Sequence, residues 1–191
     1  YLLYLVFIML DYENLTTGWV KLIPAKYRAF TTELVDDLED GMNGYFNAQT
    51  KIVVSVAILF AIGFKLIGLP FAIMLGLTLG FMNYIPYLQL VGLVPAVALA
   101  GLHSLETGDS FWITVGLVLL VFVVVQLIQD AFLTPKFMGD FSGFNPAIIL
   151  LSLSIWGSLL GMIGLIIAIP LTSLLVAYYR KYIIKGKNLD A

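Results

Sequence analysis

Two long stretches of the sequence, residues 66–105 and 141–179, contain no aspartate, glutamate, lysine or arginine. Soluble domains carry about 25% charged residues, whereas this chain of 191 residues has 12% charged and 61% apolar residues. Too little polar surface is left to coat a water-soluble globule, so the charge-free stretches belong in a lipid bilayer. The sequence therefore predicts an all-α, polytopic membrane protein.

The composition also excludes several classes of site. The chain has no cysteine, which excludes disulfides, thiolate metal sites and cysteine nucleophiles. Its formal net charge of -2 offers no basic surface to nucleic acid. The sequence lacks a GxSxG elbow, an HExxH helix and a Walker loop. Its single histidine, His103, is not accompanied by other residues at the spacing of a metal site. We therefore expect no enzyme, no cofactor or metal, and no nucleic-acid partner.

The first ten residues are apolar and precede a polar run at residues 11–17. A secretory signal peptide is disfavoured, because no basic region precedes the apolar run and no small-residue cleavage site follows it. A helix of ten residues rises about 15 Å, half of the bilayer's hydrocarbon thickness of about 30 Å. We expect residues 1–17 to be the end of a transmembrane helix whose first half lies upstream.

The one long polar segment, residues 18–51, has a helical stripe of apolar residues at steps of three and four, namely Tyr27, Phe30, Leu34, Leu38 and Met42. Pro24 suits the first turn of this helix, and Gly41 and Gly44 suit its end. The opposite face is acidic, which disfavours attraction to anionic lipid. We expect a cytoplasmic amphipathic helix against the membrane domain or a neighbouring subunit, with a solvated linker as the alternative.

Six apolar segments follow in the predicted transmembrane transport domain, residues 52–179: they are 52–69, 70–83, 89–102, 111–128, 147–158 and 161–179. The second and fifth would rise only about 21 and 18 Å as helices. Short apolar segments broken by glycine and proline are typical of re-entrant or broken helical hairpins in transporters. Six full crossings, or two crossings with two hairpins, both fit. The latter would be an inverted repeat, since both hairpins open with glycine, proline and Ala-Ile.

The lysines and arginines indicate the orientation. Eight of the ten lie either in the polar segment 18–51 or in the basic tail 180–191, and the positive-inside rule places both in the cytoplasm. The loop 103–110 has no lysine or arginine and is expected outside, whereas residues 129–146 return inside. We therefore expect a multi-pass protein with a cytoplasmic C-terminus.

A cluster of polar and aromatic residues marks the turn of the first hairpin, at Asn83, Tyr84, Pro86, Tyr87 and Gln89. Polar groups inside lipid are costly, about 2.5 to 3.5 kcal/mol for a central charge, so each one needs an explanation. Pro86 removes a backbone donor, and the free carbonyls and amides of a turn at membrane depth would bind a solute or an ion. An ordinary interfacial turn with an aromatic belt is the alternative.

A second polar cluster lies where the fourth apolar segment ends. Gln126, Gln129 and Asp130 share one helical face, because they are three and four residues apart. The acid at this position could bind a proton or a cation, or it could be an ordinary solvated carboxylate at a wet helix end.

Three further polar residues stand within apolar segments. Ser152 and Ser154 could hydrogen-bond to a substrate, although membrane serines more often bond to their own helix. Lys65 either couples an ion or reaches the interface by snorkelling. The predicted substrate-binding residues are therefore Asn83, Tyr84, Pro86, Tyr87, Gln89, Gln126, Ser152 and Ser154, and the predicted ion-coupling residues are Gln129, Asp130 and Lys65.

Four motifs occur in a distinctive order: GYFNAQ at 44–49, NYIPYLQLVG at 83–92, LTPKFMG at 133–139, and FNPAIILLSLSIWGSLLGMIGLIIAIP at 144–170. In order and spacing they resemble the AI-2E family of bacterial transporters, also called autoinducer-2 exporter-like or PerM-like proteins. The likeness covers almost the whole chain and corresponds to the C-terminal portion of the family. Leu88 and Gln89 stand where the family pattern usually has a glycine. The resemblance implies an oligomeric transporter of the bacterial inner membrane.

These observations predict a secondary transporter that moves a small polar solute or a monovalent cation across the lipid bilayer by alternating access. The family resemblance implies export of the autoinducer-2 signal, with sodium/proton exchange as the alternative, and it implies a homo-oligomer. A non-transporting membrane scaffold that assembles through its acidic helix is a rival of another class. An intramembrane hydrolase is disfavoured, because the chain lacks nucleophile pairs.

Overall fold

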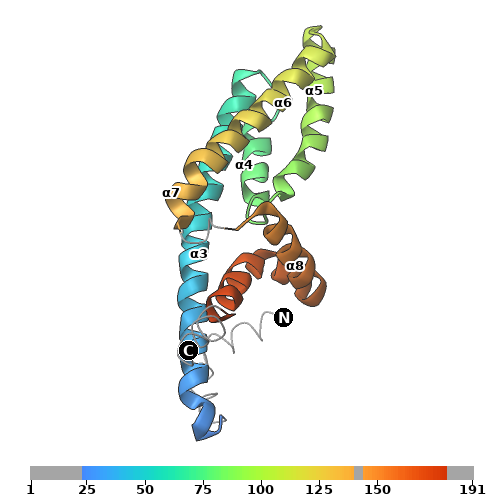
Figure 1. Ribbon diagram of the computed structural model, residues 1–191. Coiled ribbons are helices and arrows are strands. Elements are labelled where there is room, and N and C mark those ends of the chain that lie inside the picture. The colour runs from blue at the N-terminus through green and yellow to red at the C-terminus, as the bar shows by residue number, and fades with distance from the viewer. Residues whose placement is uncertain (1–22, 140–143, 180–191) are drawn as a thin grey trace, which may run out of the picture. The chain divides into compact units, whose positions relative to one another are not determined.

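The computed structural model describes residues 23–139 and 144–179. The predictions for residues 1–17 and for the tail 180–191 lie outside these ranges. The chain divides into two compact units, before and after the boundary between Gly41 and Met42. The described residues form helices and turns without a strand (Figure 1), which confirms the all-α prediction. Within residues 23–139 and 144–179, four helical stretches are long and apolar enough to cross a membrane, namely Ala25–Leu66, Leu88–Thr107, Phe111–Met138 and Pro146–Tyr179.

Helix α3, Ala25–Leu66, begins directly after Pro24, as predicted. The prediction that this helix ends at Gly41 and Gly44 is wrong, because both glycines lie inside α3. An interior glycine costs a helix only about 1 kcal/mol relative to alanine. After Gly44 the helix buries a continuous apolar stripe that includes Tyr45, Ile52 and Phe60, and this burial outweighs the cost of two glycines.

The first hairpin consists of α4, Ala72–Met82, a 3-10 turn at Leu88–Gly92, and α5, Leu93–Thr107. As a helix of 11 residues, α4 rises about 16 Å and is too short to span a bilayer. It packs tightly on α3, because a Cβ added to Gly80 would lie 2.3 Å from the Cβ of Ala57, and one added to Gly76 would lie 2.4 Å from the backbone nitrogen of Ala61. Small residues four apart on both helices thus allow close backbone approach.

The helical stretch Phe111–Met138 consists of α6, Phe111–Ile128, a π-helical turn at Gln129–Leu133, and α7, Thr134–Met138. The α-helical part has the bounds predicted for the fourth apolar segment, and the π turn and α7 continue the helical stretch beyond it. Phe122 fixes α6 against α3, with ring centroids 4.9 Å from Phe60 and 5.9 Å from Phe64. The π turn therefore continues from a firmly packed helix, and such turns occur frequently at functional sites.

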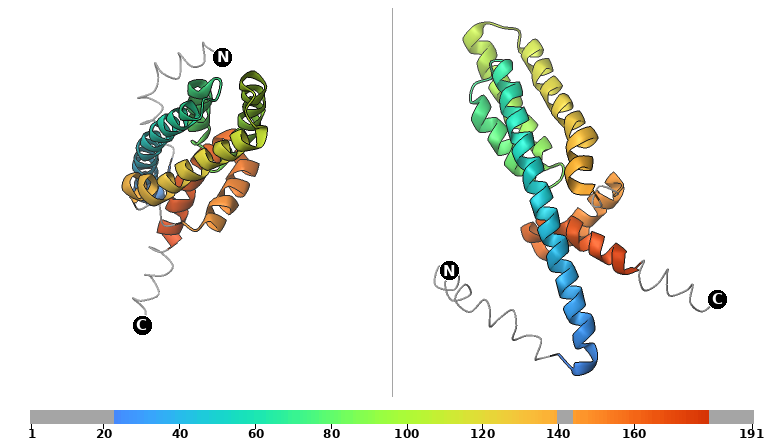
Figure 2. Two further views of the ribbon diagram at one scale, coloured as in Figure 1. Left: turned by 90° about the horizontal axis from the view of Figure 1, so that it is seen from above. Right: turned by 90° about the vertical axis from the view of Figure 1, so that its left-hand side faces the viewer.

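The last helix, α8, Pro146–Tyr179, is broken at Gly161, whose φ of 62° and ψ of −138° are accessible to glycine and strained for other residues. The chain doubles back there (Figures 1 and 2). Trp156 Nε1 donates a hydrogen bond of 3.0 Å to Thr172 Oγ1 across the hairpin. The predicted break between the fifth and sixth apolar segments is thereby confirmed.

Cysteine labelling tests the predicted orientation, since the chain has no native cysteine. Ser110 and Lys136 are both exposed and lie at opposite ends of the stretch formed by α6, the π turn and α7. We expect Ser110→Cys to react with an impermeant maleimide added outside intact cells, and Lys136→Cys to react only after the membrane is opened. The reverse pattern would overturn the orientation.

Candidate functional site

A small cavity of about 100 Å³ lies within the second unit. It is lined by residues of α3, the tip of the first hairpin, the α6 to α7 stretch and α8: Gln49, Ile52, Asn83, Pro86, Tyr87, Gln89, Gln126, Gln129, Asp130, Thr134, Met138, Ile149 and Ile169. Five of these residues carry side-chain amides, in a chain with 61% apolar residues. The cavity therefore gathers polar groups that are costly to place in a membrane domain.

The hairpin tip is held against α3 by two hydrogen bonds. Gln49 Nε2 donates to the Asn83 backbone carbonyl at 2.5 Å, and the hydroxyls of Thr50 and Tyr84 are 3.0 Å apart. The tip turns back through Tyr87, whose φ of 67° is left-handed. As a result, Gln89 enters the interior of the unit with only 2% of its surface exposed.

The amides of the tip and of α6 form a continuous chain that ends at a carboxylate. Gln89 Nε2 donates to Gln126 Oε1 at 2.7 Å, and Gln126 Nε2 donates to Asp130 Oδ2 at 3.0 Å. Longer contacts of 3.4 Å join Gln89 Nε2 to Gln129 Oε1, and Gln129 Nε2 to Asn83 Oδ1. The two polar clusters predicted from the sequence are thus one network in the structure.

Two buried atoms of this network have no hydrogen-bond partner among the residues that the structure describes. They are the nitrogen Nδ2 of Asn83, a donor, and the oxygen Oε1 of Gln89, an acceptor. Leaving a buried polar group unpaired costs about 1 to 3 kcal/mol. A bound molecule that both donates and accepts hydrogen bonds would remove this cost.

Of the other predicted substrate-binding residues, only some line the cavity. Pro86 and Tyr87 line the cavity, whereas Tyr84 binds α3 through its hydroxyl. Ser152 is buried and donates to the Ile148 carbonyl of its own helix at 2.7 Å, and Ser154 is exposed outside the cavity lining.

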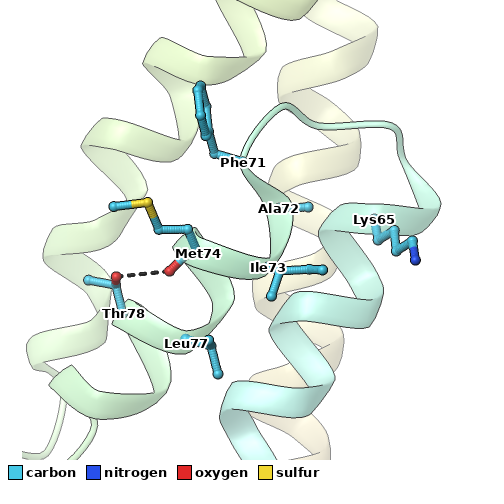
Figure 3. A pocket seen from close by; sticks show the side chains of 7 residues that line it. All are labelled: Lys65, Phe71, Ala72, Ile73, Met74, Leu77 and Thr78. Atoms are coloured by element: carbon cyan, nitrogen blue, oxygen red, sulfur yellow. Dashed lines mark hydrogen bonds between the residues drawn. The ribbon is translucent and has the colours of Figure 1, made fainter.

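Lys65 lies apart from the amide network. It borders a separate, apolar surface hollow of about 650 Å³ formed mainly by α4. Figure 3 shows its ammonium group directed away from Phe71 and Met74. The structure therefore does not bring Lys65 together with Gln129 and Asp130, the other predicted ion-coupling residues.

The sequence interpretation did not single out Gln49 as a site residue, although its amide holds Asn83 and lines the cavity. Two signals could have identified it. Gln49 is the last residue of the GYFNAQ motif, and it continues at helical spacing the stripe that contains Tyr45 and Ile52. A polar residue on such an apolar stripe marks a buried hydrogen-bonding position.

Comparisons with known proteins support a transport role. The chain is 32% identical over 161 residues to YueF of Bacillus subtilis (strain 168), which is provisionally named a transport protein. The aligned region takes in 84% of this chain and 42% of YueF. It is 27% identical over 171 residues to PerM of Escherichia coli (strain K12), provisionally named a permease, with 90% of this chain and 47% of PerM aligned. No solved structure matches the chain.

The chain thus spans less than half the length of these two relatives. A family model described as AI-2E family transporter matches residues 1–184, nearly the whole sequence. Together with the apolar helices and the buried amide network, this match leads to one conclusion: the chain belongs to the AI-2E family of transporters.

Proposed function

We propose that the protein moves a small polar solute such as the autoinducer-2 signal across the bacterial inner membrane, as a homo-oligomer with a cytoplasmic C-terminus, and that the amide-lined cavity is on the solute's path. The observation that carries this proposal is the pair of unpartnered buried atoms, Asn83 Nδ2 and Gln89 Oε1, at the cavity. A donor and an acceptor of this kind suit hydroxyl and carbonyl groups of an uncharged solute.

The shape of the site supports transport rather than permanent binding. Two of the elements that line the cavity are broken or turned, namely the tip of the first hairpin and the hairpin of α8, which contribute Pro86, Ile149 and Ile169. Discontinuous helices of this type surround substrate sites in secondary transporters, where one part of the fold rocks against another. Movement of either hairpin would open the cavity.

Sodium/proton exchange is the alternative transport activity, and one observation favours an ion-coupled step. Asp130 is exposed, lines the cavity and accepts a hydrogen bond from Gln126. A carboxylate in this position can take up a proton from water at the cavity mouth. We therefore assign ion coupling to Asp130, with Gln129 beside it, rather than to Lys65.

Flux through proteoliposomes that contain the purified full-length protein tests the proposal. We expect autoinducer-2 to cross, and Gln89→Leu to reduce its flux at least tenfold, because leucine removes the unpaired acceptor and the bond to Gln126. Ser158→Ala is the matched control, since this exposed hydroxyl bonds only to the Ile155 carbonyl of its own helix. Its flux should equal the parent's.

The same vesicles separate the rival functions. Proton-driven sodium flux without movement of autoinducer-2 would replace the solute proposal by the antiporter. A protein that oligomerises but moves neither would be a membrane scaffold, and the transport proposal would then be rejected.

A further inference from the structure

The amide network around the cavity has a fixed polarity that starts at Asp130. An ionised carboxylate only accepts hydrogen bonds, so Gln126 must turn its nitrogen toward Asp130. Gln126 Nε2 lies 3.0 Å from Asp130 Oδ2. The oxygen of Gln126 is then directed to Gln89, which must meet it with its own nitrogen at 2.7 Å. The orientation of each side-chain amide thus follows from the preceding one.

The remaining links obey the same rule. The Gln89 nitrogen also faces the oxygen of Gln129, and the Gln129 nitrogen faces the side-chain oxygen of Asn83. The two atoms left over are the Gln89 oxygen and the Asn83 nitrogen, and these are the buried atoms without a partner. The unpaired acceptor and the unpaired donor are therefore consequences of the charge on Asp130.

Protonation of Asp130 would reverse the direction of the hydrogen bonds along this network. A proton taken from solvent by a carboxylate oxygen makes that group a hydrogen-bond donor, and it can then bond to the Gln126 oxygen. Gln126 would offer its nitrogen to the Gln89 oxygen, and Gln129 would turn to accept from Asn83. After this rearrangement the cavity would face the Gln89 nitrogen and the Asn83 oxygen, so that donor and acceptor have exchanged places.

We propose that the protonation state of Asp130, transmitted through Gln126, sets the hydrogen-bonding polarity that Gln89 and Asn83 present to the solute. This inference rests on the proposed transport function and describes how the same site is regulated. A solute whose hydroxyl donates to Gln89 binds while Asp130 is ionised and is released on protonation. Gln126 is a positioning residue in this scheme, because it acts through Gln89.

The surroundings of Asp130 allow this response. The elements that line the cavity with it carry titratable groups, among them Lys51 on α3, Tyr84 and Tyr87 at the hairpin tip, and Lys136 on α7. In the part of the chain that the structure describes, none of these forms an ion pair with Asp130. Asp130 is exposed whereas Gln126 is half-buried, so Asp130 is the outer end of the amide chain.

Side-chain amide resonances of the full-length protein, labelled with nitrogen-15 glutamine in detergent micelles, test the inference without any solute. We expect the Gln89 resonance, assigned by its loss in Gln89→Leu, to shift as Asp130 titrates. The shift should disappear in Asp130→Asn and also in Gln126→Met, which keeps Asp130 and a side chain of similar length. Glu106→Gln, at an exposed acid that is not part of the cavity lining, is the control, and the Gln89 resonance should shift with pH in it as in the parent.

Binding of autoinducer-2 supplies the second measurement. Affinity should fall about tenfold as Asp130 is protonated, since one hydrogen bond to Gln89 is lost. The double variant Asp130→Asn with Gln126→Glu should restore high affinity relative to Asp130→Asn alone, because the new carboxylate again accepts from the Gln89 nitrogen.

Each result has a definite meaning. A Gln89 resonance that does not titrate in the parent, or still titrates in Gln126→Met, would overturn the amide relay. A relay that titrates as expected in a protein that neither binds nor moves autoinducer-2 would reject the proposed solute and leave the relay standing. The two proposals can therefore fail separately.

Discussion

Replacing Gly80 with valine should separate α4 from α3 and strongly destabilise the protein. A Cβ at this position would lie 2.3 Å from the Cβ and 2.6 Å from the Cα of Ala57, and backbone on a packed helix cannot move aside as a flexible side chain can. Overpacking of this kind costs about 1 to 3 kcal/mol, or more. For a protein of this size, a loss of 2 kcal/mol lowers Tm by about 4 to 8 °C. Thermal unfolding in detergent measures the change.

Gly116→Val is the matched control, because a Cβ at Gly116, on α6, meets nothing within 4 Å. Its Tm should stay within about 2 °C of the parent's. If Gly80→Val unfolded at the parent's temperature, the close approach of α3 and α4 would be disproved. The consequences would reach the site, because the hairpin tip that carries Asn83 begins where α4 ends.

Much of the fold could be predicted from the sequence, because lipid imposes strong constraints. Apolar runs without charge determine the helices, and Gly161 marks the break in α8 where the pattern of segments predicts one. The extent of α3 could not be predicted in this way. Gly41 and Gly44 are ordinary end signals, and only the packing of the residues that follow them shows why the helix continues.

The site was partly predictable for a similar reason. Polar residues inside apolar sequence are conspicuous, and both clusters were identified by that criterion. Their union was not predictable, since Gln89 and Gln126 are 37 residues apart and nothing in local periodicity says which segments meet. Lys65 illustrates the opposite case, because its charge is equally conspicuous but it lies at the border of a separate hollow, apart from the amide network.

The hairpin of α8 provides the second large effect, this time on transport. A Cβ at Gly164 would lie 1.9 Å from the carbonyl oxygen of Trp156 on the opposite arm. Gly164→Ala should therefore force the arms apart, break the bond between Trp156 and Thr172, and displace Ile169 from the cavity wall. We expect autoinducer-2 flux in proteoliposomes to fall at least tenfold, together with a Tm lowered by about 4 °C or more.

Two further variants separate the shape of the hairpin from its hydrogen bond. Trp156→Phe removes the donor to Thr172 and part of the ring but adds no atom between the arms. Loss of the bond costs about 1 kcal/mol, so most of the flux should remain. Gly116→Ala again controls for the added methyl group. Parent-like flux and Tm in Gly164→Ala would contradict the close approach of the two arms. The position of Ile169 in the cavity wall would then not depend on that approach. Loss of flux in Gly164→Ala but not in Trp156→Phe would mean that the arms' separation, more than the bond between them, keeps the cavity in its working shape.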